Sequence, residues 1–319
     1  NNFTYSLFLA NKKKNIDFNE IIKLSEFQED FGKKSQTILL EVFPEVCDEI
    51  LGMTDGLNFP YEKFASWLLC MGCCYDPNGC TAFCFIKDNN VIYGRNNDLP
   101  PFLKKVSKSI LYKLKNGHSF IGNTSSMIHF EEGLNEYGLA AAMTFLVPAM
   151  VTPGINSLFL VRYLLEKCTT AEEAIDALRG IPIASACNII LADKKRKIAV
   201  VECTPEKIHI RKPMKDEDFI VASNHFISDE MRNNNLNLIY SSDIRYQTAY
   251  NALRSIDYTN SIEHAKAILS GKYGFICQYS KELNFETIWS SVFNVTNLEI
   301  YRAEGSPLRA KYIEDKRLH

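Results

Sequence analysis

The residues best suited to chemistry are a glycine followed by a cysteine, Gly79 and Cys80, with Arg95 and Asp98 a short distance further on. Cutting the bond before Cys80 would expose an N-terminal cysteine, whose thiol is a nucleophile and whose own α-amine is a base. A free α-amine has a pKa of about 8, so it can take up a proton near neutral pH without a histidine. A nearby cation lowers the pKa of a thiol and increases its thiolate fraction. These residue types predict nucleophilic attack on an amide carbonyl.

The local sequence predicts that these residues meet at the open end of a β-hairpin. Strand-forming, alternating segments flank the turn cluster Asp-Asn-Asn at residues 88–90. A turn centred there makes Cys80 face Asp98, with Arg95 a few positions inward. Facing residues lie about 4.5–5.5 Å apart at Cβ, so we expect the guanidinium and the carboxylate within reach of the thiol and the new amine.

The spacing alone leaves a second interpretation open. Free cysteines are among the most buried residues, so Cys80 could be a packing residue, with Arg95 and Asp98 as an ordinary ion pair at the end of the hairpin. Cys70, Cys73 and Cys74 also precede Cys80, but Cys-x-x-Cys-Cys lacks a second pair at zinc-finger spacing. We therefore expect packing there and no metal site.

Six sequence blocks favour the catalytic interpretation. The first is Gly-Cys-Thr-Ala-Phe-Cys followed by Gly-Arg-Asn-Asn-Asp, and the others lie at residues 45–60, 133–139, 184–193, 223–226 and 242–246. Together they resemble the acyl-coenzyme A:6-aminopenicillanate acyltransferase family and, more distantly, the choloylglycine hydrolases and acid ceramidases. These are N-terminal-nucleophile (Ntn) amidases, and the resemblance covers residues from about 40 to 260.

The resemblance implies an α+β fold, a four-layer αββα Ntn-hydrolase sandwich with an N-terminal helical pro-segment. Residues 1–79 would be this pro-segment, an α chain after autocleavage between Gly79 and Cys80, and residues 80–319 the Ntn-hydrolase domain, the β chain. The implied catalytic residues are Cys80, Arg95, Asp98, Asn224 as the oxyanion asparagine, and Arg245. From the residues alone, the alternatives are that Asn224 is a strand-end turn residue and Arg245 a charge on a helix surface.

One position departs from the related hydrolases. The choloylglycine hydrolases have Asn or Tyr ten residues after the asparagine that is Asn135 here, and this chain has Phe145. A phenyl ring cannot donate a conventional hydrogen bond, so we expect the second oxyanion donor to be a backbone N–H near Thr81 or Phe145. Thr144, Phe145 and His225 are candidates for the pocket wall, since the α-amine leaves no need for a histidine base.

Composition limits the function classes. A formal net charge of −2 gives no general attraction to nucleic acid or to an anionic membrane, and no apolar stretch is long enough for a transmembrane helix. Ten cysteines without the density of a disulfide scaffold favour reduced thiols, so we expect a cytoplasmic enzyme, from which a leader could have been removed. We expect a small-molecule N-acyl amide substrate and no cofactor, with a homo-oligomer as one option for the assembly.

The hydrophobic pattern predicts helices first and strands after Cys80. Predicted helices cover residues 19–31, 35–51, 61–71, 157–168, 171–178, 243–256 and 262–270. Predicted strands cover residues 81–87, 91–96, 119–122, 127–132, 139–145, 187–192, 198–203, 208–211, 219–223, 287–294 and 299–303. Strand blocks around a central helix pair suit two stacked sheets with helices outside.

The leading hypothesis is an Ntn amidase. Hydrolysis and acyl transfer differ only in whether water or a second amine resolves the thioester, and hydrolysis is the simpler hypothesis because water needs no second site. The rival is a non-catalytic thiol-redox protein in which Cys80 and Cys84 form a reversible disulfide.

We predict that Arg95→Lys lowers turnover at least about tenfold, equivalent to about 1.4 kcal/mol. Lysine keeps the charge but lacks the planar fork of the guanidinium. Steady-state kinetics on a variant shown to be folded by circular dichroism measures this. Unchanged turnover in the folded variant would remove Arg95 from the site.

Overall fold

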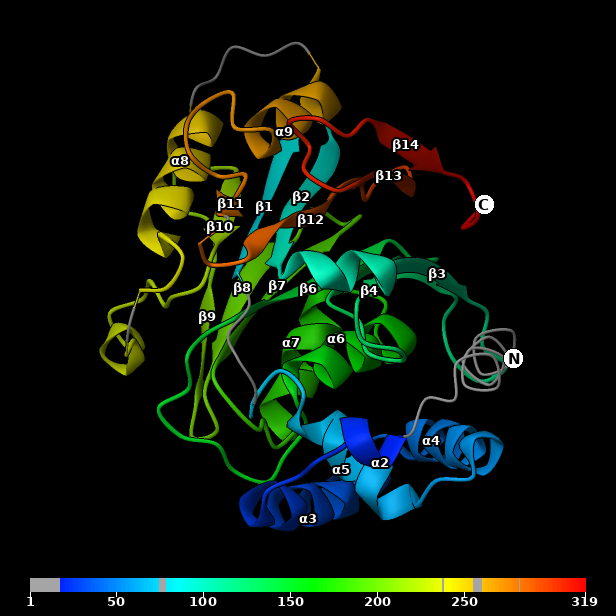
Figure 1. The fold of residues 1–319 in the computed structure, drawn as a ribbon. Coiled ribbons are helices and arrows are strands. Elements are labelled where there is room, and N and C mark those ends of the chain that lie inside the picture. Colours follow the sequence, from blue (N-terminus) through cyan, green and yellow to red (C-terminus); the bar gives the residue numbers. More distant parts are fainter. Residues whose placement is uncertain (1–17, 75–78, 237, 255–259, 281) are drawn as a thin grey trace.

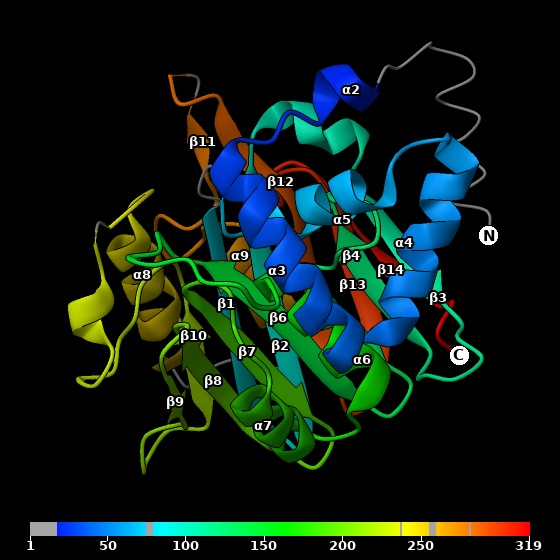
Figure 2. The ribbon, with the colours of Figure 1, turned by 90° about the horizontal axis from the view of Figure 1, so that it is seen from below.

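Two antiparallel sheets lie face to face between two layers of helices in the computed structural model (Figures 1 and 2). The structure describes residues 18–74, 79–236, 238–254, 260–280 and 282–319. Helices α8 (Ser242–Arg254) and α9 (Ser261–Leu269) cover the first sheet, and α6 (Ser157–Lys167) and α7 (Ala171–Gly180) cover the second. This is the four-layer αββα order that the sequence predicts.

The first sheet has the strand order β10-β1-β2-β12-β13-β14, with β11 paired to β12. Its strands are β1 (Gly79–Lys87), β2 (Asn90–Leu99), β10 (Phe219–Ala222), β11 (Tyr279–Ser280), β12 (Phe285–Asn294), β13 (Glu299–Glu304) and β14 (Tyr312–Asp315). The β1–β2 turn consists of Asp88 and Asn89, with φ of 49° and 64°. Two central residues with positive φ suit the right-handed twist of a tight hairpin, so the predicted hairpin is confirmed.

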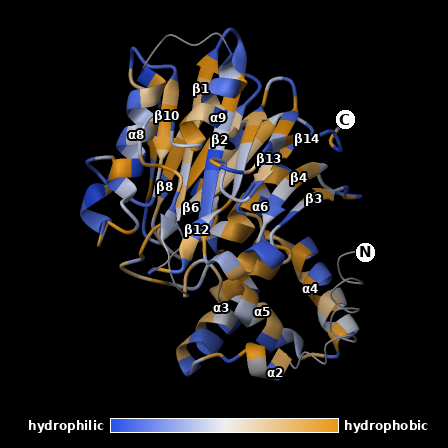
Figure 3. Cartoon of the chain, turned by 45° about the horizontal axis from the view of Figure 1, so that its top comes forward, coloured by the Kyte–Doolittle hydropathy of each residue, from blue (hydrophilic) through white to orange (hydrophobic). Residues whose placement is uncertain are grey.

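The second sheet runs β3-β4-β5-β6-β7-β8-β9 in sequence order. Its strands are β3 (Lys108–Tyr112), β4 (Phe120–Thr124), β5 (Glu132–Asn135), β6 (Leu139–Phe145), β7 (Cys187–Asp193), β8 (Ile198–Cys203) and β9 (Ile208–Arg211). Hydrophobic residues gather along the strands of both sheets (Figure 3). Small side chains such as Ala82, Ala140, Ala142 and Ala222 form part of the core between the sheets, which lets the two layers pack closely.

Three predicted elements were wrong in their bounds. The predicted helix over residues 19–31 covers α2 (Phe18–Ile21) and the start of α3 (Glu26–Val42), with residues 22–25 outside any helix. Residues 127–131 do not form a strand, because Met127 has a left-handed φ of 59° and His129 closes a turn onto Ser126; the strand begins only at Glu132. The predicted helix over residues 35–51 is two helices, since Pro44 cannot continue the helix before it. Strands β3, β11 and β14 were not predicted.

The N-terminal helices form a cap beneath α6 (Figures 1 and 2). They are α2 (Phe18–Ile21), α3 (Glu26–Val42), α4 (Pro44–Leu57) and α5 (Tyr61–Cys70). No helix in the part of the chain that the structure describes is long and apolar enough to cross a membrane.

Polar contacts and a shared apolar core hold this cap to α6. Arg162 of α6 pairs with Glu49 of the cap and donates from Nε to Glu166, 2.7 Å away. Asn156, the residue before α6, donates to the carbonyl oxygens of Leu68 (2.9 Å) and Leu69 (3.2 Å). These contacts would keep the cap bound if the chain were cut after it.

We predict that Arg162→Met lowers the free energy of unfolding by about 3 kcal/mol, because it leaves buried Glu166 without its cation. Urea unfolding measures the change. The control is Lys34→Met, which breaks the Lys34–Asp30 pair of the same cap, where both side chains are about 60% exposed; its effect should stay below about 1 kcal/mol. Equal effects would show that the buried ion pairs of Arg162 contribute no more to stability than an exposed pair.

Candidate active site

Cys80 is the second residue of β1, and its side chain lies between the two sheets with 1% exposure. It pairs with Asn97, and Gly79 pairs with Asp98. The prediction that Cys80 faces Asp98 was therefore wrong by one residue, because the turn contains two residues and is not centred on one. A shift of one residue exchanges the two faces of a strand, so Asp98 lies on the opposite face from the thiol.

Arg95 supplies the cation beside the thiol. Its Nη2 donates to Cys80 Sγ at 3.1 Å and to the carbonyl oxygen of Met143 at 3.2 Å. Burial raises the pKa of the Cys80 thiol in this continuous chain and outweighs the opposite effects of Arg95 and Arg245. The predicted arginine is in place, but the thiol is neutral in this state.

A buried carboxylate that the sequence analysis missed lies behind Arg95. Glu132 Oε1 is 3.9 Å from Arg95 Nη1, and both side chains are fully buried. Four neutral groups also donate to this carboxylate: Tyr93 Oη and Trp289 Nε1 at 2.7 Å, and Asn123 Nδ2 and Ser291 Oγ at 2.8 Å. The feature of the sequence that could have revealed Glu132 is its position directly before Gly133, at the start of a buried strand.

Asn224 and Arg245 hold the backbone of Cys80. The Cys80 N–H donates to Asn224 Oδ1 at 2.9 Å. Arg245 Nη2 donates to the same oxygen at 2.6 Å, while its Nη1 donates to the Cys80 carbonyl oxygen at 2.5 Å and to Thr81 Oγ1 at 2.7 Å. The N–H and the carbonyl group of Cys80 are thus each held by a separate side chain, and Arg245 is no surface charge.

Asp98 contacts Arg245 and makes no direct contact with the thiol, although its charge adds to the rise in the pKa of Cys80. Its Oδ2 lies 3.9 Å from Arg245 Nη1, and it accepts hydrogen bonds from Thr287 Oγ1 (2.5 Å) and Gln278 Nε2 (3.2 Å). Burial raises the pKa of the Asp98 carboxyl, and Arg245 opposes that shift. All five predicted catalytic residues therefore come together, but in two groups, on the two faces of the first sheet.

The three residues predicted to line the pocket, Thr144, Phe145 and His225, instead help to hold Asn224 and its neighbour Ser223 in place. Phe145 packs its ring into the core beneath α6, and its carbonyl oxygen accepts from Asn224 Nδ2 at 2.7 Å. Thr144 Oγ1 donates to the Ser223 carbonyl oxygen at 2.5 Å. His225 Nδ1 lies 2.6 Å from Ser242 Oγ, which accepts from the Asn224 N–H at 2.7 Å.

Gly79 is required for space. It begins β1, and it is not among the described glycines with positive φ. A Cβ atom there would lie 2.7 Å from Phe285 Cζ and 3.1 Å from Asp98 Cβ. Glycine is therefore required at this position for space and not for a left-handed backbone.

The geometry of β1 excludes the Cys80–Cys84 disulfide. Residues four apart in a strand are separated by about 13 Å, whereas bridged cysteines have Cα atoms less than about 7 Å apart. Both thiols are free. The thiol-redox hypothesis therefore loses the pair on which it depends.

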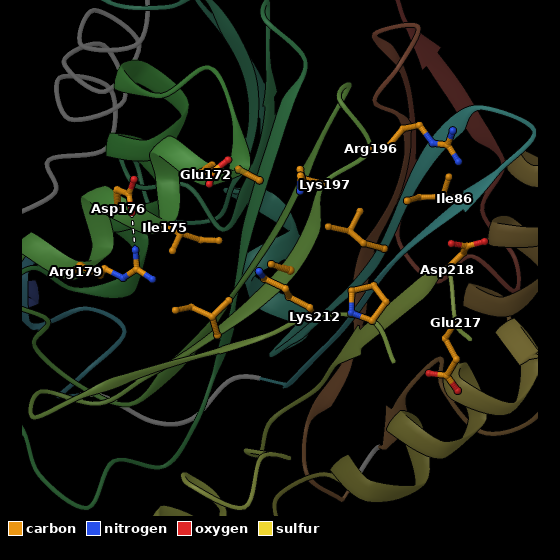
Figure 4. Close-up of a pocket in the computed structure, with 15 residues that line it drawn as sticks. Ile86, Glu172, Ile175, Asp176, Arg179, Arg196, Lys197, Lys212, Glu217 and Asp218 are labelled. Carbon is orange, nitrogen blue, oxygen red and sulfur yellow. Dashed lines mark hydrogen bonds and ion pairs between the residues drawn. The ribbon is translucent and has the colours of Figure 1, made fainter. Parts of the chain in front are cut away.

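A pocket of about 500 Å³ lies away from this cluster (Figure 4). Its lining includes Ile86 of β1, Lys197, Lys212 and Glu217. Ile86 is six residues along the strand from Cys80, or about 20 Å. This pocket therefore does not lead to the thiol.

Comparisons with known proteins identify a family and a fold. The family model of acyl-coenzyme A:6-aminopenicillanic acid acyl-transferase matches residues 85–309, which begin shortly after Cys80 and include the other four predicted catalytic residues. No curated protein sequence matches the chain.

Two solved structures show the fold. Penicillin V acylase from Agrobacterium tumefaciens is similar with a TM-score of 0.52 and 18% identity, over 74% of this chain and 85% of that one. A variant of conjugated bile acid hydrolase from Clostridium perfringens is similar with a TM-score of 0.55 and 13% identity, over 74% of this chain and 92% of that one. The predicted Ntn-hydrolase fold is confirmed.

We predict that His225 makes the fold sensitive to acid. Burial lowers its pKa to about 4, below the usual value of about 6.5, so the neutral form is favoured in the folded state. Its contribution to stability is complete above pH 6.5 and is lost as the pH falls from 6.5 towards 4. The unfolding free energy of wild type minus that of His225→Gln, measured by urea unfolding, should shrink across this window. A difference independent of pH would contradict the buried neutral histidine.

Proposed function

Because the chain belongs to the acyl-coenzyme A:6-aminopenicillanic acid acyl-transferase family, we propose that it is an autoprocessed Ntn amidase that cleaves the linear C–N bond of an N-acyl amide. One observation carries the proposal: Cys80 Sγ contacts Arg95 Nη2 at 3.1 Å while Cys80 N contacts Asn224 Oδ1 at 2.9 Å. The thiol and the prospective amine of one residue are each oriented by a buried partner, as an N-terminal nucleophile requires.

Maturation comes first in this mechanism. Cys80 Sγ attacks the Gly79 carbonyl carbon, the C–N bond breaks, and the acyl group moves from nitrogen to sulfur. Water then hydrolyses the thioester, which leaves a carboxylate on Gly79 and a free α-amine on Cys80. Residues 1–79 become the α chain and residues 80–319 the β chain, and the contacts of Arg162 and Asn156 hold the two together.

Turnover then uses the same atoms. The α-amine takes the thiol proton, and Sγ attacks the substrate carbonyl to form a tetrahedral intermediate. Collapse of the intermediate breaks the C–N bond, and the leaving amine takes the proton back from the ammonium group. Water resolves the acyl thioester to a carboxylic acid. An amine acceptor in place of water would make the same site an acyltransferase.

Each charged residue has a separate role in this scheme. Arg95 stabilises the thiolate, and Arg245 fixes the Cys80 carbonyl group and Asn224. Asp98 orients Arg245 from the other side. Asn224 holds the amine through Oδ1, and we propose that its amide N–H also contributes to oxyanion binding.

The similar structures guide the choice of substrates. The panel includes penicillins and conjugated bile acids, because the two similar solved structures are a penicillin V acylase and a conjugated bile acid hydrolase. N-acyl amino acids and acyl-homoserine lactones extend the panel to smaller amides. We propose a small-molecule N-acyl amide from this set as the substrate.

Intact-mass analysis with this substrate panel tests the proposal. Wild type should give two species that meet at Gly79 and Cys80, and it should hydrolyse at least one amide. Cys80→Ala should give one full-length species without activity. The matched control is Cys84→Ala, which alters another buried cysteine of β1 and should still be cut and active. Full activity from an uncut wild-type chain would exclude the α-amine mechanism.

A further inference from the structure

A buried amide with a free donor lies next to the nucleophile. Asn97 of β2 is paired with Cys80 in the strand register and is 1% exposed. The Cys80 thiol donates to its Oδ1 at 3.4 Å. Among the described residues, Asn97 Nδ2 has no hydrogen-bond partner.

A hydrogen-bond donor without a partner in the protein interior lowers the stability of the fold. A buried polar group without a partner costs about 1–3 kcal/mol, and most buried amides are paired. Nε of Arg95, on the guanidinium that contacts the same sulfur, also has no hydrogen-bond partner among the described residues. Two side chains that touch Sγ therefore carry donors without acceptors, which indicates that an oxygen acceptor arrives during the reaction.

The strand next to Asn97 is irregular at this point. Thr287 of β12 pairs with Asp98, but Trp289 pairs with Asn97, so Ile288 is an extra residue. Such bulges occur next to active sites, where they redirect side chains. Here the bulge lies opposite Asn97 and Asp98, whose side chains lie on opposite faces of the first sheet.

We propose that Asn97 is a catalytic residue whose Nδ2 donates to the oxyanion formed when Cys80 attacks the amide; this rests on the proposed function. It supplies a side-chain donor that Phe145 cannot, in place of the backbone N–H expected from the sequence. The other amide at the site, Asn224, already donates to the Phe145 carbonyl oxygen and accepts from Cys80 N. Asn97 instead stands on the thiol side, where the new bond forms.

The chemical step accounts for the change in hydrogen bonding. When the α-amine takes the thiol proton, Asn97 Oδ1 loses its donor, and the amide can rotate because its terminal torsion is soft. As the Sγ–C bond forms, the carbonyl π electrons move to oxygen, and the Nδ2 hydrogen donates to this charge. Collapse re-forms the carbonyl and breaks the C–N bond, and the amine leaves with the proton held by the α-ammonium.

Matched substitutions of neighbouring asparagines test the proposal. Asn97→Leu keeps the size but removes the donor, so kcat, normalised to the fraction of chain cut, should fall about 10²–10³-fold with KM nearly unchanged. The control is Asn96→Leu, on the opposite face of β2, where Nδ2 donates to the Leu269 carbonyl oxygen. It should lower the melting temperature and leave kcat within about threefold, because Asn96 does not contact Sγ.

A second measurement does not depend on turnover. Asn97→Leu removes a group that can donate to the thiolate, so the pH profile of Cys80 alkylation by iodoacetamide, followed by mass spectrometry, should move to higher pH. An active wild type with unchanged kcat and alkylation profile in folded Asn97→Leu would overturn this inference alone. A rise in KM without a fall in kcat would also overturn it, because Asn97 would then only bind substrate. A wild type that is neither cut nor active on any amide would overturn the proposed function and the inference together.

Discussion

The site depends on one buried ion pair that crosses the space between the two sheets. Arg95 belongs to the first sheet and Glu132 to the second, and neither is exposed. Burying an unpaired charge costs several kcal/mol, so the guanidinium can stay beside the thiol only if the carboxylate faces it. Donors on β2, β4 and β12 fix that carboxylate, so the packing of the sheets sets the position of Arg95.

A second charged pair on the other face of the first sheet completes the arrangement. Arg245 and Asp98 reach Cys80 through its backbone, whereas Arg95 reaches it through the sulfur. The two guanidinium groups therefore act on different atoms of one residue. This division is what the proposed mechanism needs from a cysteine with a raised pKa: its sulfur has a cation in contact, and its nitrogen is held by a separate side chain.

The sequence predicted the parts of this site that are local. The hairpin, the β6 strand and the helix that carries Arg245 follow from turn residues and from hydrophobic periodicity. The register did not follow, because a turn cluster of three polar residues does not state which two form the loop, and a shift of one residue moves Asp98 to the other face. Glu132 and Asn97 were missed for another reason: their roles depend on what packs opposite them, which is set by residues distant in sequence.

The central claim is that Cys80, as the first residue of a cut chain, carries the acyl group. The most direct measurement is to mix the enzyme with an N-acyl amide that it turns over, quench it in acid, and locate the added acyl mass by tandem mass spectrometry. The account predicts a hydroxylamine-sensitive acyl group on the sulfur of an N-terminal Cys80. An acyl group on another residue, or on Cys80 within an uncut chain, would contradict it.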